Sequence, residues 1–142
     1  MYKKKRIYVI SIISILCVVC VYYIYSAPKA SIKSVDINPN EISIISIFNG
    51  NTGKKINIDG KDDINRIITN LNDIDFQKDK SSKDYDGFSF STDFYDLDGN
   101  KIDHVTINSK DTIIYNDYFY KDKNSSIDYD FIGSLFDKYN NL

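Results

Sequence analysis

The sequence predicts an α+β fold, an antiparallel sheet with two helices packed on one face, preceded by one N-terminal transmembrane helix. Three observations lead to this prediction. The first 25 residues join a basic cluster to a long apolar run, the rest of the chain alternates short β-rich segments with turn residues, and two segments repeat apolar residues at the helical period. The chain divides accordingly into a cytoplasmic basic segment (1–6), a transmembrane signal anchor (7–25), a linker (26–30) and an extracytoplasmic α+β domain (31–142).

The apolar run at 7–25 contains no charged residue, and at about 1.5 Å per residue it is long enough to cross a hydrocarbon core of about 30 Å. A cleaved signal peptide has a shorter apolar core, followed by small residues at the cleavage site. Here Tyr25 and Pro28 stand where small residues are needed, so we expect the segment to remain as an anchor. The basic residues at 3–6 keep the N-terminus cytoplasmic, which puts the domain outside the cell membrane.

Cys17 and Cys20 have the spacing of redox and zinc sites, but they lie within the apolar run, where the reactive thiolate is disfavoured. We interpret them as small apolar residues of a membrane helix. The steps Ser11, Ser14 and Cys17 give weak support for a homodimer through that helix. No cysteine lies beyond the anchor, so the domain must be held by its core.

The charge balance of the chain limits its partners. Of the 18 Lys and Arg residues, four lie in the basic cluster, which leaves 14 against 20 acidic residues. An acidic domain of about 110 residues is large enough for one core and is unsuited to binding nucleic acid or an anionic membrane surface.

The domain is expected to begin with strands at Val35–Ile37 and Ile42–Phe48, separated by an Asn-Pro-Asn break. Asn49–Gly53 is predicted as a hairpin loop because Asn and Gly tolerate positive φ, and Ile56–Ile58 is the return strand. The clearest helix follows, over Asp62–Leu71, with Asp59 as its cap. Its apolar stripe consists of Ile64, Ile67, Ile68 and Leu71.

The second half of the domain is predicted to contain further strands and a final helix, which gives the order β-β-β-α-β-β-β-(β)-α. Ser125 or Ser126 can cap this helix, whose buried side includes Ile127, Phe131 and Leu135. The predicted strands are Ile74–Lys78, Phe88–Tyr95, Ile102–Asn108, Thr112–Tyr115 and Tyr118–Tyr120.

Two groups of residues could be interpreted as chemical sites. Asp96 and Asp98 precede Gly99 as in a calcium loop, but the residues at the other ligand positions cannot ligate, so we interpret this segment as a hairpin turn. His104 is the only histidine, and by alternation it points away from the face of Val105 and its apolar neighbours. We expect no catalytic residue, no metal site and no cofactor.

Aromatic residues are the one surplus of the domain, and they are Tyr115, Tyr118, Phe119 and Tyr120, together with Tyr85, Phe88 and Tyr95. Tyr118 and Tyr120 share a strand face by the period of two, and Phe119 between them is expected to enter the core. With Tyr115 they form the candidate partner-binding surface, because rigid amphipathic rings are favoured at binding faces. Tyrosine is also favoured simply as a strand residue, and that alternative remains open.

Several turn, cap and core segments are similar to those of a known protein family. They are Phe48–Lys54, the 62–71 helix with Asn72–Phe76, Tyr85–Phe90, Asp98–Asn100 and Ile127–Tyr129. From about Glu41 to Asp137 the chain resembles a family of small exported domains of low-GC Gram-positive bacteria, typically placed behind one membrane helix or a lipoprotein signal. The resemblance implies a membrane-anchored α+β domain. The family has no assigned activity, so no functional residue carries over.

We therefore expect a non-enzymatic module for protein–protein interaction or envelope assembly, with an envelope protein as its partner. A small-ligand or glycan sensor that uses the aromatic strand face is the alternative. A hydrolase, the third reading, rests only on His104 and the many acidic residues.

Overall fold

The computed structural model describes residues 13–23, 31–32 and 35–140. Residues 13–23 are helical, and within the described ranges no helix is long and apolar enough to cross a membrane. The basic segment 1–6 and much of the predicted span 7–25 lie outside the described residues. The anchor therefore stays a prediction.

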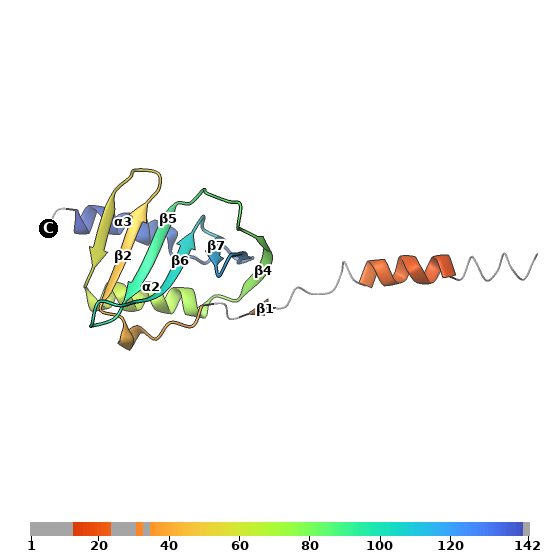
Figure 1. The fold of residues 1–142 in the computed structure, drawn as a ribbon, viewed down its shortest axis with the longest axis horizontal. Coiled ribbons are helices and arrows are strands. Elements are labelled where there is room, and N and C mark those ends of the chain that lie inside the picture. Colours follow the sequence, from red (N-terminus) through yellow and green to blue (C-terminus); the bar gives the residue numbers. More distant parts are fainter. Residues whose placement is uncertain (1–12, 24–30, 33–34, 141–142) are drawn as a thin grey trace, which may run out of the picture.

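An antiparallel sheet forms the centre of the domain, in the strand order β1-β4-β8-β7-β6-β5-β2-β3 (Figure 1). The α+β class and the antiparallel sheet are thus confirmed. The first strand contributes two residues only. The strands are β1 (Ser31–Ile32), β2 (Ile44–Asn49), β3 (Lys55–Ile58), β4 (Phe76–Ser81), β5 (Phe90–Tyr95), β6 (Lys101–Ile107), β7 (Thr112–Tyr115) and β8 (Tyr118–Lys121).

Two helices, α2 (Lys61–Asp73) and α3 (Tyr129–Tyr139), lie against one face of this sheet (Figure 1). They bury their apolar stripes against alternate residues of the strands, and the ring of Phe90 in β5 stacks on Phe136 in α3 at 5.9 Å between centroids. Among the described residues the core draws on 35–139, so we expect residues 31–142 to fold alone. Its fully buried large side chains are Phe76, Phe94, Ile45, Ile47, Ile58, Ile67, Ile68, Leu71, Ile107, Ile113, Ile132 and Leu135.

The predicted strand at Val35–Ile37 is wrong. Val35 and Ile37 are buried, but this segment pairs with no strand in the described part of the chain, and a 3₁₀ turn, η1 (Pro39–Glu41), follows it. The side chain of Asn72 in α2 takes the place of a neighbouring strand. Its Oδ1 accepts from the Ile37 N–H at 3.1 Å, and its Nδ2 donates to the Ile37 carbonyl at 2.7 Å.

The predicted helix caps are also wrong. The N-cap residue of α2 is Gly60, not Asp59. The N-cap residue of α3 is Asp128, and neither helix has a side-chain cap hydrogen bond. A Cβ atom at Gly60 would lie 2.5 Å from the Tyr139 hydroxyl, so a larger residue there would displace the end of the Tyr139 side chain. Ser125 and Ser126, which were predicted to cap α3, lie in the loop before it. There the Ser126 N–H donates to the Asp122 carboxylate.

Asp63, in the first turn of α2, connects it to the end of α3. Its Oδ2 accepts from Lys138 Nζ at 2.6 Å and from the Tyr139 hydroxyl at 2.7 Å. Burial favours a higher pKa for Asp63, but the hydrogen bonds from Lys138 and Tyr139 outweigh it and hold the pKa below its ordinary value of 3.8. Burial and the carboxylate of Asp63 raise the pKa of Tyr139 to about 12.

We expect this carboxylate to make stability pH-dependent. Because its pKa is lower in the folded state, its contribution is complete above the unfolded-state value of about 4 and is lost as the pH falls through the folded-state pKa. Asp63→Asn should cost about 1 kcal/mol near neutral pH, since Lys138 is largely exposed and its charge is screened, and less in acid. Urea unfolding at neutral and at acidic pH measures the loss of stability, with Asp62→Asn, at an exposed residue, as control. A loss in acid equal to that at neutral pH would contradict the prediction.

The buried hydroxyl of Thr92 has no partner among the described residues. Thr92 in β5 is fully buried between Ile47 and Val105 of the flanking strands, and its Oγ1 makes no hydrogen bond within that part of the chain. A buried hydroxyl without a partner costs about 1–3 kcal/mol, so Thr92→Val should raise the free energy of unfolding by about 1 kcal/mol. Urea unfolding tests this. The control is Thr106→Val, whose hydroxyl is partly exposed and contacts His104; loss of stability in Thr92→Val would contradict the prediction.

Candidate functional site

The sheet face that neither α2 nor α3 covers is the candidate site, and we call it the open face (Figure 1). Because Ile45 and Ile47 point into the core, the residues between and beside them in β2 point to the open face, and the registers extend this assignment across the sheet. The open-face side chains of the central strands are Ile44, Ser46, Phe48, Ser91, Asp93, Tyr95, His104, Thr106, Ile114 and Phe119.

A polar cluster occupies the middle of the open face. Asp93 Oδ1 lies 2.5 Å from Lys101 Nζ and 2.7 Å from His104 Nδ1, and His104 Nε2 lies 3.1 Å from Thr106 Oγ1. Since a carboxylate only accepts hydrogen bonds, Nδ1 carries the imidazole proton. Burial favours a higher pKa for Asp93, but the hydrogen bonds from Lys101 and His104 outweigh it and lower the pKa.

The prediction that His104 points away from the core face is confirmed, since Val105 and Ile107 are fully buried and the imidazole is partly exposed. Its partner Asp93 could not be found from the sequence, because that contact depends on the β5–β6 register, which sets Asp93 opposite His104. Carboxylate, imidazole and hydroxyl stand in the order used for nucleophile activation. However, β6 is an interior strand, so the backbone N–H groups beside Thr106 serve the ladder and not an oxyanion.

A loop from 82 to 89 carries aromatic rings onto the open face. The Tyr85 ring meets Phe119 edge-on at 5.1 Å between centroids, and the Phe88 ring lies 5.9 Å from Phe48. Between this loop and strands β6 and β7 lies a shallow hollow of about 550 Å³, which Tyr85 and Phe88 line together with polar groups such as His104. The open face thus combines exposed aromatic surface with hydrogen-bonding groups.

The predicted surface of Tyr115, Tyr118 and Tyr120 does not form one exposed face. The β7–β8 register turns all three toward the helices, and Tyr120 is 7 % exposed within the core. The Tyr115 hydroxyl donates to Asp103 at 2.9 Å, and burial together with that carboxylate raises the pKa of Tyr115 to about 12. Tyr118 alone is exposed, beneath the ammonium of a lysine in β4.

Phe119 is buried as expected, with 7 % of its surface exposed, but it does not lie beneath the helices. Its ring points to the open face, where Tyr85 covers it. The alternation along β8 was therefore predicted correctly, but with the two faces exchanged.

The Asp96–Asn100 segment is the predicted hairpin turn. The Asp96 carboxylate accepts from the backbone N–H of Asp98 and of Asn100 at 2.9 and 2.8 Å, and Gly99 has a φ of +81°. The side-chain hydrogen bond from Asn100 is the largest cause that lowers the pKa of Asp96, and these backbone hydrogen bonds lower it further. Across the described ranges, no group of three or more His, Cys, Asp or Glu side chains is arranged to hold a metal ion.

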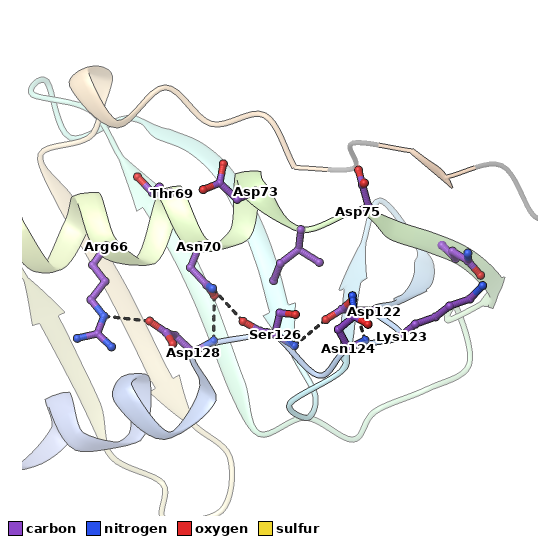
Figure 2. Close-up of a pocket in the computed structure, with 12 residues that line it drawn as sticks. Arg66, Thr69, Asn70, Asp73, Asp75, Asp122, Lys123, Asn124, Ser126 and Asp128 are labelled. Carbon is purple, nitrogen blue, oxygen red and sulfur yellow. Dashed lines mark hydrogen bonds and ion pairs between the residues drawn. The ribbon is translucent and has the colours of Figure 1, made fainter.

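A second hollow, of about 690 Å³, lies between α2 and the loop from 122 to 128 (Figure 2). Asn70 clamps this loop: its Nδ2 donates to the Ser126 carbonyl and its Oδ1 accepts from the Asp128 N–H, both at 2.9 Å. Asp128 also pairs with Arg66 at 2.9 Å. Asn70, Arg66, Ser126 and Asp128 therefore satisfy one another and anchor the loop to α2.

No family model, no curated protein and no solved structure matches this chain. The resemblance to small exported domains therefore stays a prediction. The site is assigned from its own geometry, with the open face as the strongest candidate.

Proposed function

We propose that residues 31–142 form a non-enzymatic interaction module of the bacterial cell envelope. In this proposal residues 7–25 anchor the chain by a single membrane pass, with the N-terminus in the cytoplasm and the domain outside. The partner is an envelope protein that binds the open face.

The exposed aromatic surface of the open face carries this proposal. Phe48 is 36 % and Tyr85 46 % exposed, although both rings already contact neighbouring rings. Rigid aromatic side chains beside hydrogen-bonding groups are the composition enriched at the centres of protein interfaces. The paired charges of Asp93 and Lys101 on the same face favour a partner that brings polar as well as apolar contacts.

Cross-linking of the full chain in its membrane, followed by co-purification, tests the proposal. Replacing Phe48 and Tyr85 together by Ser should leave the domain folded and remove the cross-linked protein. The matched control is Tyr118→Ser, because Tyr118 is also an exposed aromatic residue but lies on the helix side. Retention of the same partner by the double variant, or equal loss in the control, would show that the open face is not the binding surface.

A small-ligand or glycan sensor is the second candidate, and the hollow beside Tyr85 favours it. Its aromatic ring and the polar groups at His104 and Thr106 are the elements that sugar rings require for stacking and hydrogen bonding. In the same experiment a saccharide, and no protein, would then be recovered with the chain. A chemical-shift titration with cell-wall fragments should in that case move the signals of Tyr85 and His104 first.

A further inference from the structure

The strand β3 ends the sheet, and its outer edge is exposed. In the strand order β3 has β2 as its one neighbour, and Lys55, Asn57 and the following Asp59 are exposed. The other sheet edge, β1, has only two residues and is too short to extend the sheet. Free edges with unpaired backbone groups are the natural place for another strand to pair.

The hydrogen bonding of the β2–β3 hairpin fixes which backbone groups face outward. The Asn49 N–H donates to the Lys54 carbonyl at 2.8 Å, so this is a hydrogen-bonded pair. Alternation then directs the N–H and C=O groups of Ile56 and Ile58 toward β2. Those of Lys55 and Asn57 point away from the sheet, and continuing the alternation by one residue beyond β3 directs those of Asp59 the same way.

The side chains at the same three positions are complementary to themselves. If two copies of β3 pair antiparallel about a two-fold axis at Asn57, each Lys55 stands opposite Asp59 of the other copy. Neither residue forms an ion pair within the described parts of the chain. Ile56 stands opposite Ile58, which continues the apolar row on the helix side. A parallel pairing would instead set Lys55 against Lys55.

A lone lysine on an edge strand usually prevents pairing, because two copies would repel each other. Here the acidic residue four positions later lies where it neutralises that repulsion in one register only. From the outward backbone groups and this charge pattern we propose that β3 is a self-association edge, which joins two copies of the chain into one continuous antiparallel sheet. The pairing uses only five residues, so it forms a weak dimer, and both open faces point to the same side.

A cysteine at the two-fold axis tests the pairing directly. Two residues of a hydrogen-bonded antiparallel pair have Cα atoms about 5.5 Å apart, within the range of a disulfide. The full chain, with Cys17→Ser and Cys20→Ser and purified in mild detergent, should form a disulfide dimer on oxidation when it carries Asn57→Cys. The control is Leu97→Cys, at an apolar side chain that is 88 % exposed, which reports random collisions.

Charge exchange then tests the register. Lys55→Asp should abolish the Asn57→Cys dimer, as should Asp59→Lys, because each sets like charges opposite one another. The combination of both should restore it. Sedimentation of the same variants without the added cysteine should follow the same order. Dimer formation by Asn57→Cys no greater than by Leu97→Cys, or no response to charge reversal, would overturn the proposal. None of these results depends on Phe48 or Tyr85, so the proposed function is tested separately.

Discussion

Phe94→Ala is expected to be the most damaging single substitution in the domain. Phe94 is fully buried in β5, near the middle of the sheet, where its ring packs in the core between the strands and the helices. Truncating a buried aromatic ring removes its transfer free energy and leaves a cavity, at a cost of about 3–5 kcal/mol. The free energy of unfolding of a domain of this size is about 5–15 kcal/mol, so the variant should remain only marginally folded.

Urea unfolding of residues 31–142 measures this effect. Leu97→Ala is the matched control, since Leu97 lies three residues later in the following turn and is almost fully exposed. We expect the control to change the free energy of unfolding by less than about 0.5 kcal/mol. A loss of less than 1 kcal/mol in Phe94→Ala would mean that the core does not close around β5.

The core was largely predictable because it follows from periodicity. The stripe from Ile64 to Leu71 and the alternation from Phe90 to Tyr95 both appear in the structure, since burial of one helix or strand face depends on local spacing alone. The hairpin at Gly99 was predictable for the same reason, because its chemistry is contained within a few residues.

Which of the two alternating faces of a strand meets the helices cannot be predicted in the same way. In β8 the residues on both faces are aromatic, so alternation alone did not indicate which face meets the helices. The structure decides it by pairing Ile113 with Tyr120 and by supplying Tyr85 as a cover for Phe119 on the other side. The sequence therefore places the partner surface at Tyr115, Tyr118 and Tyr120. The exposed aromatic residues of the open face are instead Phe48 and Tyr85, and only Tyr85 belongs to the aromatic surplus that the sequence shows. The contact between Asp93 and His104 likewise depends on register, which no local pattern reveals.

Asn72 shows how a side chain can replace a predicted strand. The apolar alternation at Val35–Ile37 is genuine, because both side chains are buried. What the sequence does not reveal is where the backbone hydrogen bonds of this segment go. Buried N–H and C=O groups need partners, and for Ile37 both are provided by one amide on α2.

Asn72→Ala should accordingly leave both backbone groups of Ile37 without a partner, and should cost about 2 kcal/mol. Asn65→Ala on the same helix is the matched control, because Asn65 is exposed and its replacement by Ala should be neutral or slightly stabilising. Urea unfolding gives the free energies. Amide hydrogen exchange gives the local test: the Ile37 N–H should exchange faster in Asn72→Ala and remain unchanged in Asn65→Ala. Unaltered protection of the Ile37 N–H would show that another group holds this segment in place.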